Sequence, residues 1–226
     1  MECFERLKLE FEKNANPENV KPMAAYMKHH FDFLGLKSPI RRELQKSFMK
    51  EASKLSWDDF AALIQLLWNQ PFREYQYAAT ELLDKNKKKI PLDYIADFVW
   101  LITTKSWWDS VDSIVPRSLG FYFQKFPKQI DVYIPKWIES ENIWLQRAAI
   151  LFQLKYKEKT NEALLFDIVK KLKNGNEFFV NKAIGWALRE YSKTNPKEVA
   201  IFVAANKLSN LSHREALKVI NLKSNL

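Results

Sequence analysis

The sequence is poor in the residue types on which most cofactor and metal sites depend. It has four glycines, one cysteine and three histidines in 226 residues. Four scattered glycines cannot build a glycine-rich loop around a nucleotide phosphate. The single cysteine, Cys3, excludes an internal disulfide bond, and the histidines lack the HExxH and CxxC contexts of metal sites. We therefore expect a cytoplasmic protein that needs neither cofactor nor metal.

Long apolar runs are missing as well. No segment approaches about 18 consecutive apolar residues, and residues 1–5 lack the basic and then apolar order of a signal peptide. We therefore expect no membrane association. Positive charge is abundant, because 36 Lys and Arg outnumber 27 Asp and Glu, a net charge of +9. This excess favours a polyanionic partner such as nucleic acid, although many proteins carry it only for solubility. A high aromatic content, with 8 Trp, 8 Tyr and 16 Phe, is a second indication of a binding surface.

Apolar residues recur at spacings of three and four along the chain, which predicts an all-α fold. An internal repeat supports this prediction, since similar segments are anchored 35 residues apart, and residues 213–216 resemble them after a shorter step of 32. A period of this length filled by two helices is typical of a HEAT-like α-solenoid with a concave, here basic, cleft. No linker interrupts the chain, so we expect one domain, residues 1–226. The anchors are Arg42, Tyr77, Asp112, Arg147 and Lys182.

Helix boundaries follow from the apolar period together with Ser, Asn and Pro start signals. The predicted helices cover residues 2–14, 17–30, 39–53, 57–69, 72–86, 91–104, 107–124, 128–139, 142–157, 161–173, 177–193, 196–206 and 211–221. Pro116 and Pro135 lie inside two of them, where we expect kinks or shortened ends.

The stretch around residues 104–112 combines bulky aromatics with carboxylates after a clear helix start. Ser106 is predicted to be an N-cap, and Asp109 completes a capping-box-like pattern. Trp108 and Asp112 then lie four residues apart on one helix face. An accessible indole beside a carboxylate can hold a cation, worth roughly 0.5–2 kcal/mol for the ring. The alternative is that Trp108 is a core residue and Asp112 a solvated charge.

Two further stretches supply candidate ligands for phosphate. Arg147 carries the planar guanidinium that suits a pair of phosphate oxygens, and Lys155 is placed eight residues later on the same predicted face. Lys182, Trp186 and Arg189 share a face of a later helix. For Trp186, packing in the core remains an equally good interpretation.

Long motifs in these same stretches closely resemble the AlkD-type DNA alkylation repair glycosylases. The resemblance extends over nearly the whole chain. Its motifs are PMAAYMK at 22–28, FLG at 33–35, KSWWDSVDSIVP at 105–116, YIPKWI at 133–138, WLQRAAI at 144–150 and KAIGWALREY at 182–191.

The resemblance implies a HEAT-like superhelix that removes N3- and N7-alkylated purines, such as 3-methyladenine and 7-methylguanine, from double-stranded DNA in base-excision repair. It also implies a monofunctional, monomeric enzyme that needs no metal and does not flip the base. Trp108 and Trp186 resemble the indoles against the sugar of the lesion, and Asp112 the carboxylate beside the scissile bond. Arg147 looks like a phosphate-binding arginine, and Tyr26 like an aromatic near the lesion.

The chemistry suits these residues. An alkylated purine is already cationic, and breaking its N-glycosidic bond moves positive charge to the sugar in an oxocarbenium-like transition state. Asp112 could stabilise that charge and orient a water, while the indoles hold the sugar. Two alternatives remain at this stage: a catalytically silent HEAT-repeat protein that binds DNA of unusual structure, and a protein-interaction scaffold.

Overall fold

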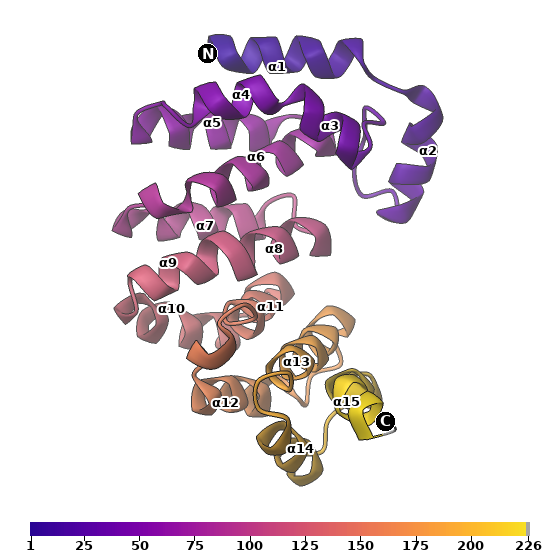
Figure 1. The fold of residues 1–226 in the computed structure, drawn as a ribbon, viewed down its shortest axis with the longest axis vertical. Coiled ribbons are helices and arrows are strands. Elements are labelled where there is room, and N and C mark those ends of the chain that lie inside the picture. Colours follow the sequence, from indigo (N-terminus) through magenta and orange to yellow (C-terminus); the bar gives the residue numbers. More distant parts are fainter. Residues whose placement is uncertain (225–226) are drawn as a thin grey trace. The chain divides into compact units, whose positions relative to one another are not determined.

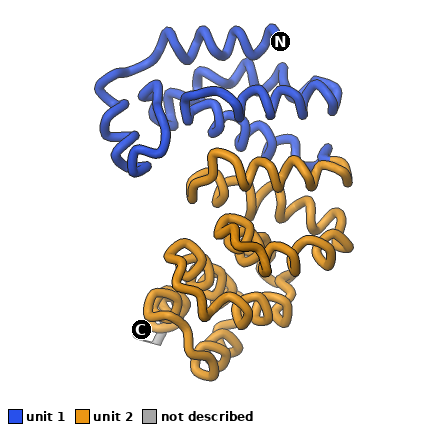
Figure 2. The backbone as a smooth tube through the Cα atoms, turned by 180° about the vertical axis from the view of Figure 1, so that it is seen from behind, with its two compact units in different colours: residues 1–90 blue, residues 91–226 orange. Residues whose placement is uncertain are grey.

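The fold is seen in a computed structural model that describes residues 1–224, with side chains to residue 222. Backbone contacts divide the chain into two compact units, Met1–Ile90 and Pro91–Leu226 (Figure 2). Both units are built from helices, which confirms the predicted all-α class (Figure 1). The boundary between them carries no glycine- or serine-rich linker, so the composition offers no signal for it.

The first unit contains six α-helices and a short 3₁₀ turn. These elements are α1 (Glu2–Lys13), α2 (Pro17–Tyr26), α3 (Ser38–Leu44), α4 (Lys46–Ala52), α5 (Trp57–Asn69), α6 (Arg73–Asn86) and η1 (Lys87–Lys89). Two of its helices begin at the capping residues that the sequence predicted. Asn16 caps α2 by accepting a hydrogen bond from the Glu18 amide, and Ser56 caps α5 by accepting one from the Asp59 amide.

The predicted helix 17–30 ends early, at Tyr26. Lys28 and His29 adopt positive φ angles of 57° and 59°, which turn the chain out of the helix. The buried carboxylate of Glu74 then accepts hydrogen bonds from the amides of residues 34, 35 and 36, at 2.9–3.1 Å. These bonds satisfy the backbone amides of the loop that follows the helix. Gly35 is required in this loop, because its φ is +85° and a Cβ would lie 2.0 Å from the Asn16 carbonyl oxygen.

The second unit stacks helix pairs. Its elements are η2 (Leu92–Tyr94), α7 (Ile95–Thr103), α8 (Trp108–Ile114), η3 (Val115–Leu119), α9 (Gly120–Lys125), α10 (Lys128–Glu139), α11 (Ile143–Leu151), η4 (Lys157–Lys159), α12 (Glu162–Leu172), α13 (Phe178–Tyr191), α14 (Pro196–Ala205) and α15 (Asn210–Ser224). The second helices of successive pairs pack on one another, α11 on α8 and α13 on α11. The anchors of the sequence repeat, Asp112, Arg147 and Lys182, lie on these second helices, which is the α-solenoid arrangement (Figure 1).

Several predicted helices of this unit prove shorter or broken. The predicted helix 107–124 consists of α8, the π-helical turn η3 and α9, because Pro116 lacks the amide that a continuous α-helix would use. The predicted helix 142–157 ends at Leu151, where a series of turns begins. The disturbance expected at Pro116 is therefore confirmed. At Pro135 no shortened end is found, because α10 runs over the whole predicted range, Lys128–Glu139.

Aromatic residues make up much of the core of the second unit. Phe98, Tyr122, Phe123 and Phe152 are completely buried and contact one another or Trp137 at ring-centroid distances of 5.2–5.8 Å. Packing therefore accounts for much of the aromatic content that the composition alone assigned to a binding surface. Within the described residues, no helix is both long and apolar enough to cross a lipid bilayer.

Candidate functional site: an aromatic cleft around Asp112

A cleft of about 340 Å³ opens on the second unit between α8, α11 and α13. It combines aromatic rings with charged groups of both signs. Its lining residues are Trp108, Asp112, Arg147, Phe178, Phe179, Lys182, Trp186 and Arg189. Six of the eight site residues predicted from the sequence therefore come together in one place.

The start of α8 sets the position of Trp108 and Asp112, but not by the predicted cap. Trp107 is the N-cap, and the Ser106 hydroxyl donates to the Ile102 carbonyl at the end of α7, 2.7 Å away. The capping box expected at Ser106 is therefore wrong. Lys105 turns the chain with a φ of 47°, and the short α7–α8 connection uses Ser106 to satisfy the preceding helix instead. The predicted shared face of Trp108 and Asp112 persists, since both line the cleft.

Asp112 and Arg147 form a bidentate ion pair. Arg147 Nε lies 2.8 Å from Asp112 Oδ1, and Arg147 Nη2 lies 2.8 Å from Oδ2. Arg147 is 3% exposed, and the Asp112 side chain is 17% exposed. An ionised carboxylate has about four acceptor positions, so two remain after the guanidinium is bound. Asp112 therefore keeps acceptor capacity on the side of the cleft.

The environment of Asp112 works against its ionisation. Burial raises the pKa of this carboxyl above its ordinary value, the hydrogen bonds and charge of Arg147 oppose that rise, and the nearby charge of Asp109 adds to it. An anion held in this way gains more than a solvated one when a positive charge comes close, because little water screens the interaction.

Arg147 is anchored on three sides. Asn142 caps α11 by accepting from the amides of residues 144 and 145, and this start places Arg147 in the second turn. Its Nη1 donates to the Phe179 carbonyl oxygen at 2.5 Å, in addition to the two bonds to Asp112. The sequence suggested that Arg147 binds phosphate. The structure places its guanidinium on Asp112 and α13, with little exposed surface.

An aromatic cluster supports one wall of the cleft. The rings of Trp107 and Trp144 each lie 5.0 Å from the ring of Phe179, and 5.7 Å from each other. Phe178, which is 59% exposed, contacts Phe179 edge to face. The sequence patterns did not predict a role for these two phenylalanines, although they lie just before the Lys182–Trp186 motif on the same helix. Trp144 packs against the other rings of this cluster and is not among the residues that line the cleft.

The part of the rim formed by α13 carries two cations around a half-buried indole. Lys182, Trp186 and Arg189 are on α13 and share one face, as the spacing predicted. Lys182 Nζ lies 2.8 Å from Glu215 Oε1, and Arg189 Nη1 lies 2.7 Å from Glu215 Oε2. Glu215 comes from α15 and was not identified as a site residue from the sequence. The sequence feature that could have identified it is the last copy of the repeat, residues 213–216, which follows after a shorter step.

Two predicted DNA contacts lie elsewhere. Lys155 is an exposed residue at the end of the turn after α11 and is not among the cleft residues. Its predicted helix ends before it, so the shared face with Arg147 does not form. Tyr26 ends α2 of the first unit and is 68% exposed.

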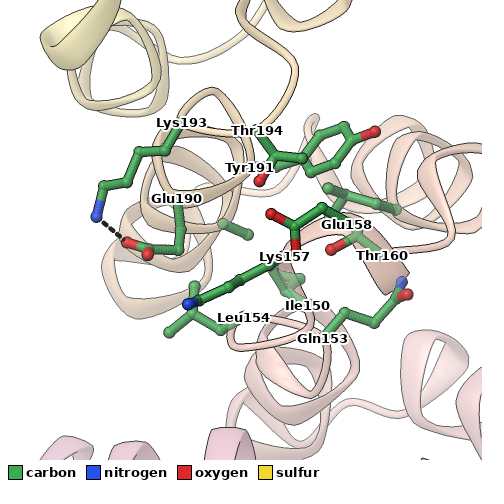
Figure 3. A pocket seen from close by; sticks show the side chains of 12 residues that line it. Ile150, Gln153, Leu154, Lys157, Glu158, Thr160, Glu190, Tyr191, Lys193 and Thr194 are labelled. Carbon is green, nitrogen blue, oxygen red and sulfur yellow. Dashed lines mark hydrogen bonds and ion pairs between the residues drawn. The ribbon is translucent and has the colours of Figure 1, made fainter.

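A second pocket, of about 190 Å³, lies between the loop after α11 and the end of α13. Figure 3 shows Lys157 and Glu158 on one side of it and Tyr191 and Lys193 on the other. Lys193 pairs with Glu190, and the Tyr191 hydroxyl donates to Glu162. Its charged groups include no carboxylate framed by indoles, so the cleft is the better candidate site.

The cleft has the features needed to hold a flat cation. One buried carboxylate lies among indole and phenyl rings, and Lys182 and Arg189 at the rim can meet an anion. Within the described residues, no group of three or more His, Cys, Asp or Glu side chains is arranged to hold a metal ion.

Comparisons with known proteins agree with this picture. A family profile described as DNA alkylation repair enzyme matches residues 7–220. The fold is similar to a solved structure described as a predicted DNA alkylation repair enzyme from Enterococcus faecalis, with 36% identity and a TM-score of 0.84 over 90% of this chain and 95% of that one. It also resembles smu.31 from Streptococcus mutans, with 20% identity and a TM-score of 0.59 over 78% of this chain and 95% of that one, a likeness of fold alone. A comparison with curated proteins finds no match.

Proposed function

Because this chain belongs to the DNA alkylation repair enzyme family, we propose that it is a monofunctional DNA glycosylase that releases cationic N3- and N7-alkylpurines from duplex DNA. The observation that carries the proposal is the placement of Asp112. This carboxylate is ion-paired, largely buried and part of a cleft that Trp108 and Trp186 also line.

In the proposed reaction, the bond between C1′ of the deoxyribose and the alkylated purine nitrogen breaks first. The bonding electrons leave with the purine, which becomes neutral, and the positive charge develops on the sugar. Asp112 stabilises this oxocarbenium-like ring by its charge, and the faces of Trp108 and Trp186 stabilise it by cation–π attraction. A water held by Asp112 then attacks C1′ and passes its proton to the Asp112 carboxylate, which later releases it to solvent, and an abasic site is left.

Arg147 is assigned a positioning role in this scheme. Its two bonds to Asp112 fix the carboxylate, and its bond to the Phe179 carbonyl ties that arrangement to α13. Lys182 and Arg189 are proposed to meet phosphates beside the cleft, and Lys155 and Tyr26 to make further DNA contacts outside it. The damaged base needs no extrusion in this scheme, because the groups that act on the sugar line an open cleft and not a closed base pocket.

The test is incubation of the protein with duplex DNA that carries one 7-methylguanine. We expect release of free 7-methylguanine and alkali-sensitive abasic sites at the position of the lesion, and neither product from an unmodified duplex. Asp112→Asn should lose most of this release while still binding the duplex. Strong binding without base release would favour the catalytically silent DNA-binding protein, and weak, salt-insensitive binding would favour a protein-interaction scaffold.

A further inference from the structure

Glu215 lies behind the cleft and contacts both of its rim cations. Each carboxylate oxygen is used by a different partner, Oε1 by Lys182 and Oε2 by Arg189. Only 12% of the Glu215 side chain is exposed, against 38% for Lys182 and 25% for Arg189. The two cations can therefore reach a ligand in the cleft, while Glu215 acts on that ligand only through them.

The packing of α15 on α13 creates this arrangement. Gly185 lies between Lys182 and Arg189 along α13, and a Cβ at Gly185 would come within 2.6 Å of the Glu215 Cβ. The Ser212 hydroxyl, one turn before Glu215, donates to the Asn181 carbonyl at 2.8 Å. The missing side chain at Gly185 thus allows Glu215 to lie directly over α13 and bridge two residues that are seven positions apart.

The charges make this bridge more than a packing feature. Lys182 and Arg189 bring two positive charges to the rim, and Glu215 cancels one of them. The hydrogen bond from Lys182 is the largest influence on the pKa of Glu215, which lies below its usual range, so Glu215 is ionised at neutral pH. Cations released from Glu215 would be free to swing toward DNA phosphates, with a gain in non-specific affinity.

We propose that Glu215 is a positioning residue that holds Lys182 and Arg189 beside Trp186 and limits the affinity of the cleft for undamaged DNA. The part of this inference that concerns base release rests on the proposed function, whereas the part that concerns DNA affinity does not. A residue that merely attached α15 would, when removed, weaken both stability and DNA binding. If Glu215 has the proposed role, its removal strengthens DNA binding instead.

The test compares Glu215→Gln with Glu190→Gln. Both variants raise the net charge by one from neighbouring positions, but Glu190 pairs with Lys193 and lines the second pocket. Binding to an undamaged duplex is measured across salt concentrations. For Glu215→Gln we expect tighter binding at low salt and a log–log slope steeper by about 0.9, equivalent to about 3.5-fold more affinity lost between about 50 and 200 mM salt. Glu190→Gln should match the wild type.

Base release gives a second, independent readout. Single-turnover release of 7-methylguanine by Glu215→Gln should fall by about tenfold at saturating protein, because misplaced rim groups hold the sugar less well. Unchanged or weaker binding by folded Glu215→Gln, or the same gain in Glu190→Gln, would overturn the proposal. If wild-type protein binds DNA but releases no base, the glycosylase assignment fails while the binding comparison still decides the role of Glu215.

A thermal melt verifies that Glu215→Gln is folded. Should it unfold at the assay temperature, Glu215→Asp replaces it, with the charge retained but the side chain one methylene too short to reach both cations. That variant should keep the salt slope of the wild type and lose base-release rate. Wild-type base release by Glu215→Asp would contradict the positioning role.

Discussion

Two carboxylates of this protein contact arginines of a neighbouring repeat, and their surroundings differ sharply. In the first unit, Glu81 accepts bonds from Arg41, Arg42 and Gln45 at 2.5–3.0 Å. In the second unit, Asp112 has Arg147 as its charged partner and shares a cleft with indoles. Burial works against the ionisation of both, yet the three donors around Glu81 lower its pKa, whereas the pKa of Asp112 is raised. The negative charge of Glu81 is thus well compensated by its donors, whereas the negative charge of Asp112 is only partly compensated.

This difference separates a structural ion pair from a candidate catalytic one. Glu81 has its charge balanced within the protein, so an added cation gains little there. Asp112 is the less well compensated anion, so it would strongly stabilise a positive charge that develops nearby in a transition state. Enzymes commonly place strained or poorly compensated charges at their active sites.

The largest effect we expect is on stability, from removal of one arginine in each unit. Arg147→Met leaves Asp112 buried without its partner and the Phe179 carbonyl without its donor, so it should lower the free energy of unfolding by about 3–5 kcal/mol. Arg42→Met is the matched control, because Arg42 is 65% exposed and Glu81 keeps Arg41 and Gln45. It should cost at most about 1 kcal/mol. Urea denaturation of both variants measures this, and equal losses would show that the two pairs do not differ.

Catalysis should separate the two carboxylates next. Asp112→Asn removes the charge that faces the developing cation and should slow single-turnover release of 7-methylguanine by about 10²–10³-fold. Glu81→Gln should change the same rate less than about twofold, within the ±0.5 kcal/mol typical of a change away from the site. Duplex binding serves as the control for folding in both variants. Comparable slowing by both substitutions would remove Asp112 from its special role.

Acid should affect the two carboxylates at different pH. Since Asp112 must be ionised to act and its pKa is raised above 3.8, kcat/KM for base release should fall as the pH drops through a value above 3.8. The pKa of Glu81 is lowered below 4.5, so its contribution to stability is present above its unfolded pKa and is lost only as the pH falls through the lower, folded value. Activity should therefore decline before circular dichroism reports unfolding. A rate that falls only together with the helical signal would contradict this order.

The sequence predicted the neighbours along each helix better than the partners across helices. The period placed Trp108 with Asp112, and Lys182 with Trp186 and Arg189, because spacings of three and four residues define a helix face. The repeat also separated Asp112 from Arg147 by one period. It could not reveal that their side chains pair, since that depends on how α8 and α11 pack.

Other misses have similar causes. Glu215 was overlooked because the repeat shortens before α15, and its function depends on the close approach that Gly185 permits. Lys155 was assigned to the face of Arg147 because nothing in its apolar pattern marked the end of α11 at Leu151. Ser106 looked like a cap, but the hydroxyl satisfied the helix before it. For Glu215 a tertiary contact decided what the local pattern left open, whereas for Ser106 a competing local hydrogen bond did.

The smallest effect concerns the indoles that distinguish the surroundings of Asp112 from those of Glu81. Trp108→Phe and Trp186→Phe keep an apolar ring in the cleft but weaken the attraction for a cation, so each should slow base release by about 2–30-fold, equivalent to about 0.5–2 kcal/mol. Trp57→Phe is the control, because Trp57 is also partly exposed and stacks on Phe60 in the first unit, with a ring-centroid distance of 5.3 Å. It should leave the rate unchanged. If the cleft variants weaken binding of the 7-methylguanine duplex but leave base release at saturating protein unchanged, the indoles act by packing, and the contrast between the two carboxylates then rests on charge alone.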